Sequence, residues 1–144
     1  MTLLDANVLI YAYNADAPEH PRVHAWLEDL FAAGEPVGIP WLALWAFVRV
    51  ATNPRLSSTP KPAAEVFPIV RGLLAHPQVL VIEPGARHAE TLERLVVDNR
   101  ISGTLMTDAV FAALAIEHGA TLASTDRDFS RFSGLRWINP LAPA

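Results

Sequence analysis

The sequence predicts an α/β fold, with a small, mainly parallel sheet covered by helices on both faces. Short apolar runs typical of strands alternate with longer stretches of helical spacing along all 144 residues. That alternation is the pattern of βαβ units, whose crossover helices cover a parallel sheet. We find no internal repeat and no linker long enough to divide the chain. We therefore expect one domain over residues 1–144, large enough for a real core.

Five short strands are expected, each of them a brief apolar segment. They are Thr2–Leu4, Val37–Ile39, Val79–Ile82, Thr121–Ser124 and, less regular than the rest, Arg136–Ile138.

Helices are expected between these strands. The first helical stretch begins at Val8–Tyr13, is interrupted by Pro18 and Pro21, and resumes over Val23–Ala32. Pro40 starts an apolar helix, because proline is tolerated in the first turn, and Pro68 either kinks a helix over 63–75 or marks its true start. The remaining helices are expected over 41–52, 63–75, 87–98 and 108–118, the last capped by Thr107 and ended by Gly119, with a Pro- and Ser-rich loop over 54–62.

Composition limits the class of protein. The hydrophobic fraction of 51% indicates a globular chain, and no apolar run reaches transmembrane length. The chain has no cysteine, which excludes disulfides and thiolate zinc sites, and no basic leader precedes the first strand, so we expect a cytoplasmic protein with no membrane partner. The net charge of −4 counts mildly against nucleic-acid binding, but ten of the eleven basic residues are arginine, which suits phosphate contacts.

Four aspartates lie where strands are expected to end or helices to begin. Asp5 follows the first strand, Asp108 opens the last long helix, and Asp126 and Asp128 follow the fourth strand. Because the carboxyl ends of parallel strands share one edge, these residues should converge there. Clustered carboxylates repel one another unless a cation lies between them, and oxygen ligands favour Mg²⁺ or Mn²⁺.

Each aspartate also has a purely local interpretation. Asp5 is a good N-cap, Asp108 suits the positive end of a helix, and Asp126 and Asp128 are ordinary turn residues. Only the joint pattern favours a metal site.

Other residue groups have less specific interpretations. The five histidines are scattered and are best read as surface or helix-end residues. Trp41, Trp45 and Phe47 are either core residues or part of a partner surface. A cluster of Arg127, Arg131 and Arg136 is either a solvated face or a track for phosphates.

Three segments resemble the PIN domain, and VapC-type toxins of bacterial toxin–antitoxin pairs in particular. These are LLDANVLIYAYN, PWLALWAFVRVATNPR and TDAVFAALAIEHGATLASTDRDFSRFSGLRWINPL, which together run through most of the chain. The resemblance implies a three-layer α/β/α sandwich and an Mg²⁺-dependent endoribonuclease, with Mn²⁺ as a possible substitute. It also implies an RNA substrate, a cognate antitoxin that blocks the site, and a homodimer.

By the same resemblance, Asp5, Asp108 and Asp126 are the catalytic and metal-binding acids, with Asp128 as an accessory ligand. Asn7, and Thr125 or Ser124, would orient the carboxylates.

One position departs from the family pattern. The family usually carries a glutamate three residues before an arginine in the second helix, whereas here Ala46 precedes Arg49. The site would then hold metal more weakly, bind one ion instead of two, or be inactive. The alternative function is therefore a PIN-like module that binds RNA or antitoxin without cleavage.

Other α/β enzymes fit the residues less well. An aspartyl phosphatase would want a second aspartate where Asn7 stands, and a phospho-receiver domain needs a well-placed lysine, whereas Lys61 is expected in a loop. A dinucleotide enzyme needs a glycine-rich turn after the first strand, and DANVL has none.

Overall fold

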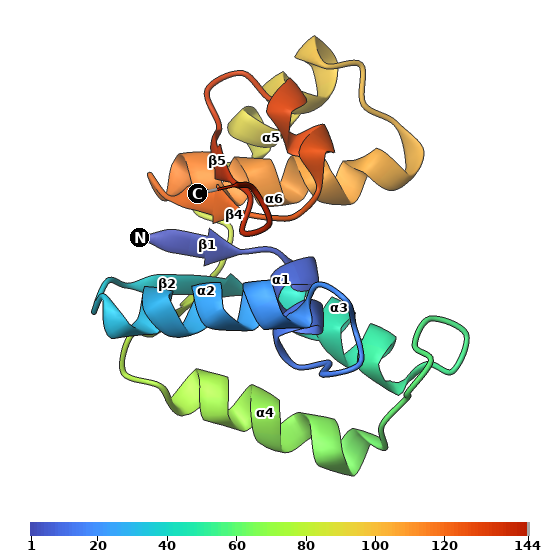
Figure 1. The fold of residues 1–144 in the computed structure, drawn as a ribbon. Coiled ribbons are helices and arrows are strands. Elements are labelled where there is room, and N and C mark those ends of the chain that lie inside the picture. The colour runs from blue at the N-terminus through green and yellow to red at the C-terminus, as the bar shows by residue number, and fades with distance from the viewer. Residues whose placement is uncertain (144) are drawn as a thin grey trace.

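The computed structural model describes residues 1–143 and contains one five-stranded sheet (Figure 1). The strand order is β3-β2-β1-β4-β5, and every neighbouring pair is parallel. The predicted α/β class and sheet are therefore confirmed. The strands are β1 (Thr2–Leu4), β2 (Val37–Pro40), β3 (Val79–Ile82), β4 (Thr121–Ala123) and β5 (Arg136–Ile138).

Helices cover both faces of the sheet. In Figure 1, α5 and α6 lie on one side of the sheet and α1 to α4 on the other. This follows from right-handed crossovers, because the chain moves from β1 to β2 to β3 in one direction and then returns past β1 to β4. The helices are α1 (Ala6–Ala12), α2 (His20–Ala32), α3 (Trp41–Thr52), α4 (Ala63–Ala75), α5 (His88–Asp98) and α6 (Met106–Glu117), with 3₁₀ turns η1 (Gly103–Leu105) and η2 (Arg127–Arg131).

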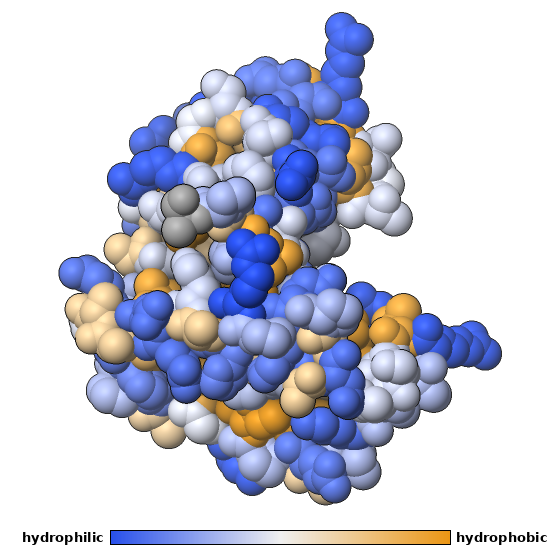
Figure 2. Space-filling view, viewed as in Figure 1, coloured by the Kyte–Doolittle hydropathy of each residue, from blue (hydrophilic) through white to orange (hydrophobic). Residues whose placement is uncertain are grey.

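The surface is hollowed on the side to which β1 points. Figure 2 shows this hollow between the part of the molecule that carries α6 and the loop that follows α3. The residues that follow β1 and β4 therefore lie on the hollowed side.

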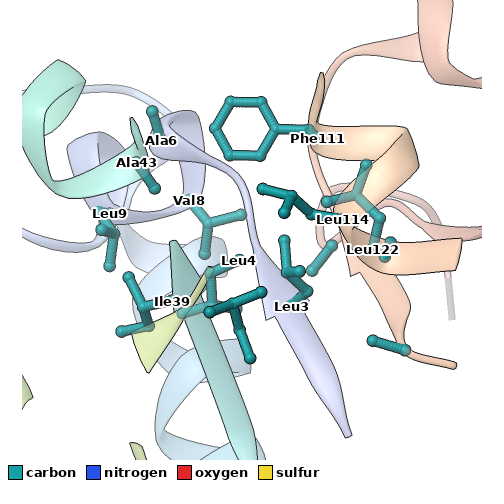
Figure 3. Packing of buried hydrophobic residues seen from close by; sticks show 14 of the residues in the cluster. Leu3, Leu4, Ala6, Val8, Leu9, Ile39, Ala43, Phe111, Leu114 and Leu122 are labelled. Atoms are coloured by element: carbon teal, nitrogen blue, oxygen red, sulfur yellow. The ribbon is translucent and has the colours of Figure 1, made fainter. Parts of the chain in front are cut away.

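The apolar core lies on both faces of β1 (Figure 3). Leu3 and Leu4 are fully buried and point to opposite faces, as neighbouring strand residues do. Leu114 of α6 lies on the side of Leu3, and Leu9 and Ile39 lie on the side of Leu4. This packing fixes β1 in the centre of the fold, and with it the residue that follows β1.

Prolines and caps set helix boundaries that differ from the predicted ones. The first helical stretch is two separate helices, and α1 already begins at Ala6 because the Asp5 side chain accepts a hydrogen bond from its N–H. Pro21 lies in the first turn of α2, where a missing N–H leaves no bond unmade. Pro68 lies inside α4, so it does not mark the start of that helix.

The predicted cap of the last long helix is wrong. Helix α6 begins at Met106 rather than Asp108, and no side chain of residues 1–143 caps it. The 3₁₀ turn η1 runs directly into α6, so Thr107 already lies inside the helix. The predicted end at Gly119 is close: α6 ends at Glu117, and Gly119 has a φ of 62°, which glycine adopts easily.

Among residues 1–143, no helix has the length and apolar character needed to cross a membrane.

Candidate active site

Asp5 and Ser124 follow neighbouring strands at the carboxyl edge of the sheet. Strands β1 and β4 pair in register, Leu4 opposite Ala123, and the Asp5 N–H donates to the Ala123 carbonyl at 3.0 Å. The strand order reverses between β1 and β4, because β2 lies on the other side of β1. Such a switch point is where open α/β sheets bind ligands.

The Asp5 carboxylate is buried, with 8% of the residue exposed, and three donors hold it. Its Oδ2 accepts hydrogen bonds from Ser124 Oγ at 2.7 Å and from Asn7 Nδ2 at 2.9 Å. Its Oδ1 accepts one from the Ala6 N–H at 2.6 Å. Asp5 therefore caps α1, as expected of an aspartate at a helix start. It also lies at the carboxyl edge of the sheet, where the four aspartates together were expected to form a metal site.

Burial raises the pKa of Asp5 from 3.8 to about 6. Hydrogen bonds from Ser124 and Ala6 lower the pKa, and the negative charges of Asp108 and Asp126 raise it. The ionised carboxylate is therefore costly without a positive charge nearby, although three donors are already in place for it.

Asp108 comes to the site from the opposite layer, in the first turn of α6. Its pKa is raised, first by burial and then by the charges of Asp126 and Asp128, while Arg131 lowers it. Within residues 1–143, no hydrogen bond engages its carboxylate. The side chain is thus free to ligate a cation, and its environment disfavours a bare negative charge.

Asp126 and Asp128 form a tight turn after β4. Asp126 Oδ1 accepts a hydrogen bond from the Asp128 N–H at 2.8 Å, and the Asp126 N–H donates to Ser124 Oγ at 3.0 Å. Asp128 is exposed and lies 3.6 Å from Arg131 in an ion pair. Asp126 therefore makes the local hydrogen bonds expected of a turn residue. At the same time, the charges of Asp126 and Asp128 lie close enough to Asp108 to raise its pKa.

Asn7 links the two strand ends. It donates through Nδ2 to Asp5 and, at 3.0 Å, to Ser124 Oγ, and its Oδ1 accepts from the Thr125 N–H at 3.1 Å. The hydroxyl that contacts Asp5 belongs to Ser124, while Thr125 contributes its backbone. Of the two candidates that the sequence left open, Ser124 is the one whose side chain orients the carboxylate.

The donor chemistry of the site fits a hard divalent cation. Asp5, Asp108 and Asp126 offer only oxygen, and their charges act on one another. Over the described part of the chain, however, no three acidic or histidine side chains come close enough to form a ready-made metal cage. Both observations fit a divalent cation that keeps several of its waters and binds one or two carboxylates.

Ala46 lies on α3, half-buried against the core, and Arg49 is exposed. No acid replaces the glutamate that the family pattern places at position 46. The three arginines of the predicted track are all exposed, and two of them are engaged: Arg131 pairs with Asp128, and Arg136 donates to the Gly119 carbonyl.

The aromatic residues of α3 differ in burial, so the core role is confirmed for Phe47 alone. Phe47 is buried, whereas Trp41 and Trp45 are 37% and 65% exposed and stack on each other with ring centroids 6.4 Å apart. The tryptophans line a surface cavity of about 590 Å³ together with Ile82 and Val110.

Sequence reasoning missed a partly buried pair at the other end of α6. His88 Nδ1 lies 2.5 Å from Glu117 Oε2, and the two side chains are 17% and 6% exposed. Glu117 Oε1 also accepts a hydrogen bond from the Gly85 N–H at 2.6 Å. The two residues are 29 positions apart, and the sequence gave no signal of their contact, because it depends on how α5 packs on α6.

Comparison with known proteins identifies relatives over almost the whole chain. The family model of the PIN domain matches residues 2–135. Ribonuclease VapC31 of Mycobacterium tuberculosis is 44% identical over 140 residues, which cover 97% of this chain and 99% of that protein. Ribonuclease VapC25 of the same organism is 41% identical with the same coverage.

Solved structures of low sequence identity share the fold. A VapBC2 complex from Rickettsia felis, bound to a promoter DNA fragment, contains a chain that is 20% identical with a TM-score of 0.69, covering 96% of this chain and 97% of that one. Mycobacterium tuberculosis VapC20, described as a sarcin–ricin loop cleaving toxin, is 21% identical with a TM-score of 0.66, covering 94% and 99%.

Proposed function

Because this chain belongs to the PIN domain family, we propose that it is a metal-dependent endoribonuclease and the toxin of a type II toxin–antitoxin pair. The relatives named ribonuclease VapC support the activity, since they match the chain from end to end. The single observation that carries the proposal is the convergence of Asp5, Asp108 and Asp126 at the switch point of the sheet.

The residues divide into acids that would hold metal and groups that position them. Asp5, Asp108 and Asp126 are the catalytic and metal-binding acids, with Asp128 as an accessory ligand. Asn7 and Ser124 hold Asp5, and the Thr125 N–H holds Asn7.

PIN-domain ribonucleases of the VapC group depend on a divalent metal, and we propose that it is Mg²⁺ here, with Mn²⁺ as a substitute. When bound, such an ion neutralises phosphate charge and lowers the pKa of a coordinated water. Within the protein, Ser124 and Asn7 keep Oδ2 of Asp5 in place. Asp126, whose charge acts on Asp5, would accept a hydrogen bond from the attacking water. The net reaction would be hydrolysis: the oxygen of a water bonds to phosphorus, and the ribose oxygen of one RNA fragment leaves and takes up a proton.

The alternative, a PIN-like module that binds RNA or antitoxin without cleavage, is not favoured. Ala46 removes one carboxylate, but the four aspartates and the network around Asp5 are all present. These carboxylates are enough to hold one divalent ion.

Two surfaces suit the proposed protein partners. The apolar groove between α2 and α4, lined by Leu27, Phe31 and Leu73, suits an amphipathic helix such as an antitoxin would supply. The Trp41–Trp45 surface suits a second copy of this chain. The cytoplasmic location expected from the sequence stays a prediction.

The test is cleavage of total RNA by purified, antitoxin-free protein in Mg²⁺ or Mn²⁺ and in EDTA. We expect discrete, metal-dependent fragments that disappear in Asp5→Asn while the circular dichroism spectrum stays the same. A folded Asp5→Asn variant with full activity would overturn the assignment. Cleavage that appears only after Ala46→Glu would instead favour the disabled alternative.

A further inference from the structure

We propose that a cavity beside the acidic edge, between α1, α3 and α4, binds one nucleobase of the RNA next to the cleaved phosphodiester. The proposal rests on the proposed ribonuclease function, and it names the part of the substrate that this wall of the site recognises.

The cavity has a suitable size and lining for a flat, polar ring. Its volume is about 300 Å³, at the lower end of the range for small-ligand pockets. Apolar walls come from Phe47 and Ala51 of α3 and from Ile69 of α4, and polar groups come from α1 and from the loop after α3. One side is therefore apolar enough to take a base face, and the other can form hydrogen bonds to a base edge.

Helix α1 connects the cavity to the acidic edge. Asn7, Ile10 and Tyr11 line the cavity and lie three and four residues apart along one face of α1, and Asn14 lines it from the segment that follows the helix. Asn7 also holds Asp5 and Ser124. From Asn7 to Tyr11 the helix rise is about 6 Å. A nucleotide whose phosphate lies at Asp5 can therefore reach the cavity with its base.

Tyr11 is the ring best placed to stack on that base. The other tyrosine of the cavity, Tyr13, already packs on Phe47, with centroids 5.8 Å apart and the planes tilted by 52°. Tyr11 is half-buried, and within the described residues its ring pairs with no other aromatic side chain. Proteins that bind single-stranded RNA use such rings as stacking platforms.

Hydrogen-bonding groups also line the cavity. Asn14 uses Oδ1 to accept from the Asp16 N–H at 3.2 Å and from Thr59 Oγ1 at 3.5 Å. In residues 1–143 no acceptor engages its Nδ2, which can therefore donate to a base carbonyl or ring nitrogen. Lys61, the only lysine, also lines the cavity and adds a positive charge that favours an RNA strand over an apolar peptide.

Nuclear magnetic resonance tests the cavity without relying on cleavage. The Asp108→Asn protein in EDTA would be titrated with each of the four 5′-ribonucleoside monophosphates and, as a control without a base, with ribose 5-phosphate. We expect a nucleotide to shift the backbone amide signals of Tyr11, Asn14 and Ala51, and ribose 5-phosphate to leave them in place. Ala51→Trp, which fills the cavity, and Tyr11→Ala, which removes the platform, should both abolish the shifts.

Equal shifts with ribose 5-phosphate would overturn the proposal, as would shifts that survive in Ala51→Trp and Tyr11→Ala. Shifts produced by an antitoxin peptide and by none of the nucleotides would assign the cavity to a protein partner and would also overturn it.

Kinetics on RNA provide the second readout. Tyr11→Ala should lower kcat/KM by roughly ten- to a hundredfold, as loss of one base–aromatic stack does, while Tyr11→Phe should retain most of it. Phe67→Ala is the matched control, because Phe67 is an exposed ring of α4 that does not line the cavity. Absence of cleavage by the unmodified protein would refute the ribonuclease function, whereas the nucleotide titration still decides the cavity on its own.

Discussion

The hydroxyl of Ser124 donates a 2.7 Å hydrogen bond to Oδ2 of Asp5 and so joins two residues that are 119 positions apart. Ser124 is completely buried, and its Oγ also accepts hydrogen bonds from Asn7 Nδ2 and from the Asp126 N–H, each at 3.0 Å. A single hydroxyl therefore organises the ends of β1 and β4 and the first turn of α1.

Ser124→Ala should destabilise the fold and weaken the site. The substitution removes one of three donors to a buried carboxylate, which costs roughly 1–3 kcal/mol of unfolding free energy and raises the pKa of Asp5 further. Urea denaturation would measure the loss. Ser102→Ala, at an exposed serine, is the control and should be neutral; equal stability of both variants would contradict the role of Ser124.

The stability of the metal-free protein should fall as the pH rises through about 6. Burial raises the pKa of Asp5 from 3.8 to about 6, so the folded state favours the protonated carboxyl. That contribution, about 3 kcal/mol, is fully present below about pH 4 and is lost as the pH rises through the folded pKa. Denaturation in EDTA would measure it against Asp5→Asn, in which this part of the pH dependence should be absent.

Mg²⁺ should reverse that loss above pH 6, because it favours the ionised carboxylate. If the wild-type protein and Asp5→Asn show the same pH dependence and the same response to Mg²⁺, Asp5 is not the group that titrates.

Ala46→Glu should lower the metal concentration needed for cleavage. It restores the acid that the family pattern places in this helix, and an added carboxylate strengthens attraction for a divalent cation. Cleavage rates over a range of Mg²⁺ concentrations would show the change, with Ala46→Gln as the uncharged control. An identical Mg²⁺ dependence in the two variants would mean that position 46 does not contribute to metal binding.

His88→Ala should reduce stability without changing the Mg²⁺ dependence of cleavage. The variant leaves the Glu117 carboxylate, 6% exposed, with only the Gly85 N–H, at a cost of roughly 1–3 kcal/mol. Asp108 lies at the opposite end of α6, about 14 Å away along the helix. Denaturation and Mg²⁺ titration would test both parts, with His24→Ala, whose pair with Glu28 is exposed, as the neutral control.

Trp45→Glu should convert a dimer into a monomer. The tryptophan is 65% exposed, and a buried charge in an apolar interface would cost more than the interface gains. Light scattering on a sizing column would give the mass. A monomeric wild-type protein would refute the homodimer, and a dimeric variant would place the interface elsewhere.

The fold was predictable because its signals are local. Each strand is a short apolar run. Pro40 marks the start of α3 and Gly119 marks the end of α6, each through its own backbone preference. The start of α6 was not predictable, because the turn η1 leads into it without a side-chain cap.

The acids of the candidate site were predictable from their places after strands or at the start of a helix, but their positioning group was not. Whether Ser124 or Thr125 faces Asp5 depends on where β4 ends, and it ends at Ala123, one residue before the predicted boundary. The cavity beside α1 also had no signal in the sequence, because its walls come from two other helices and a loop.

The most direct test of the central claim is RNA cleavage by Asp108→Asn as a function of Mg²⁺. No hydrogen bond holds the Asp108 carboxylate within the described residues, and its pKa is raised, so the neutral amide should leave the fold intact or slightly more stable. We predict a folded protein that cleaves RNA at least a hundredfold more slowly, on the order of other losses of a group that acts in the transition state. A folded Asp108→Asn protein that cleaves at the wild-type rate with an unchanged Mg²⁺ requirement would contradict the account.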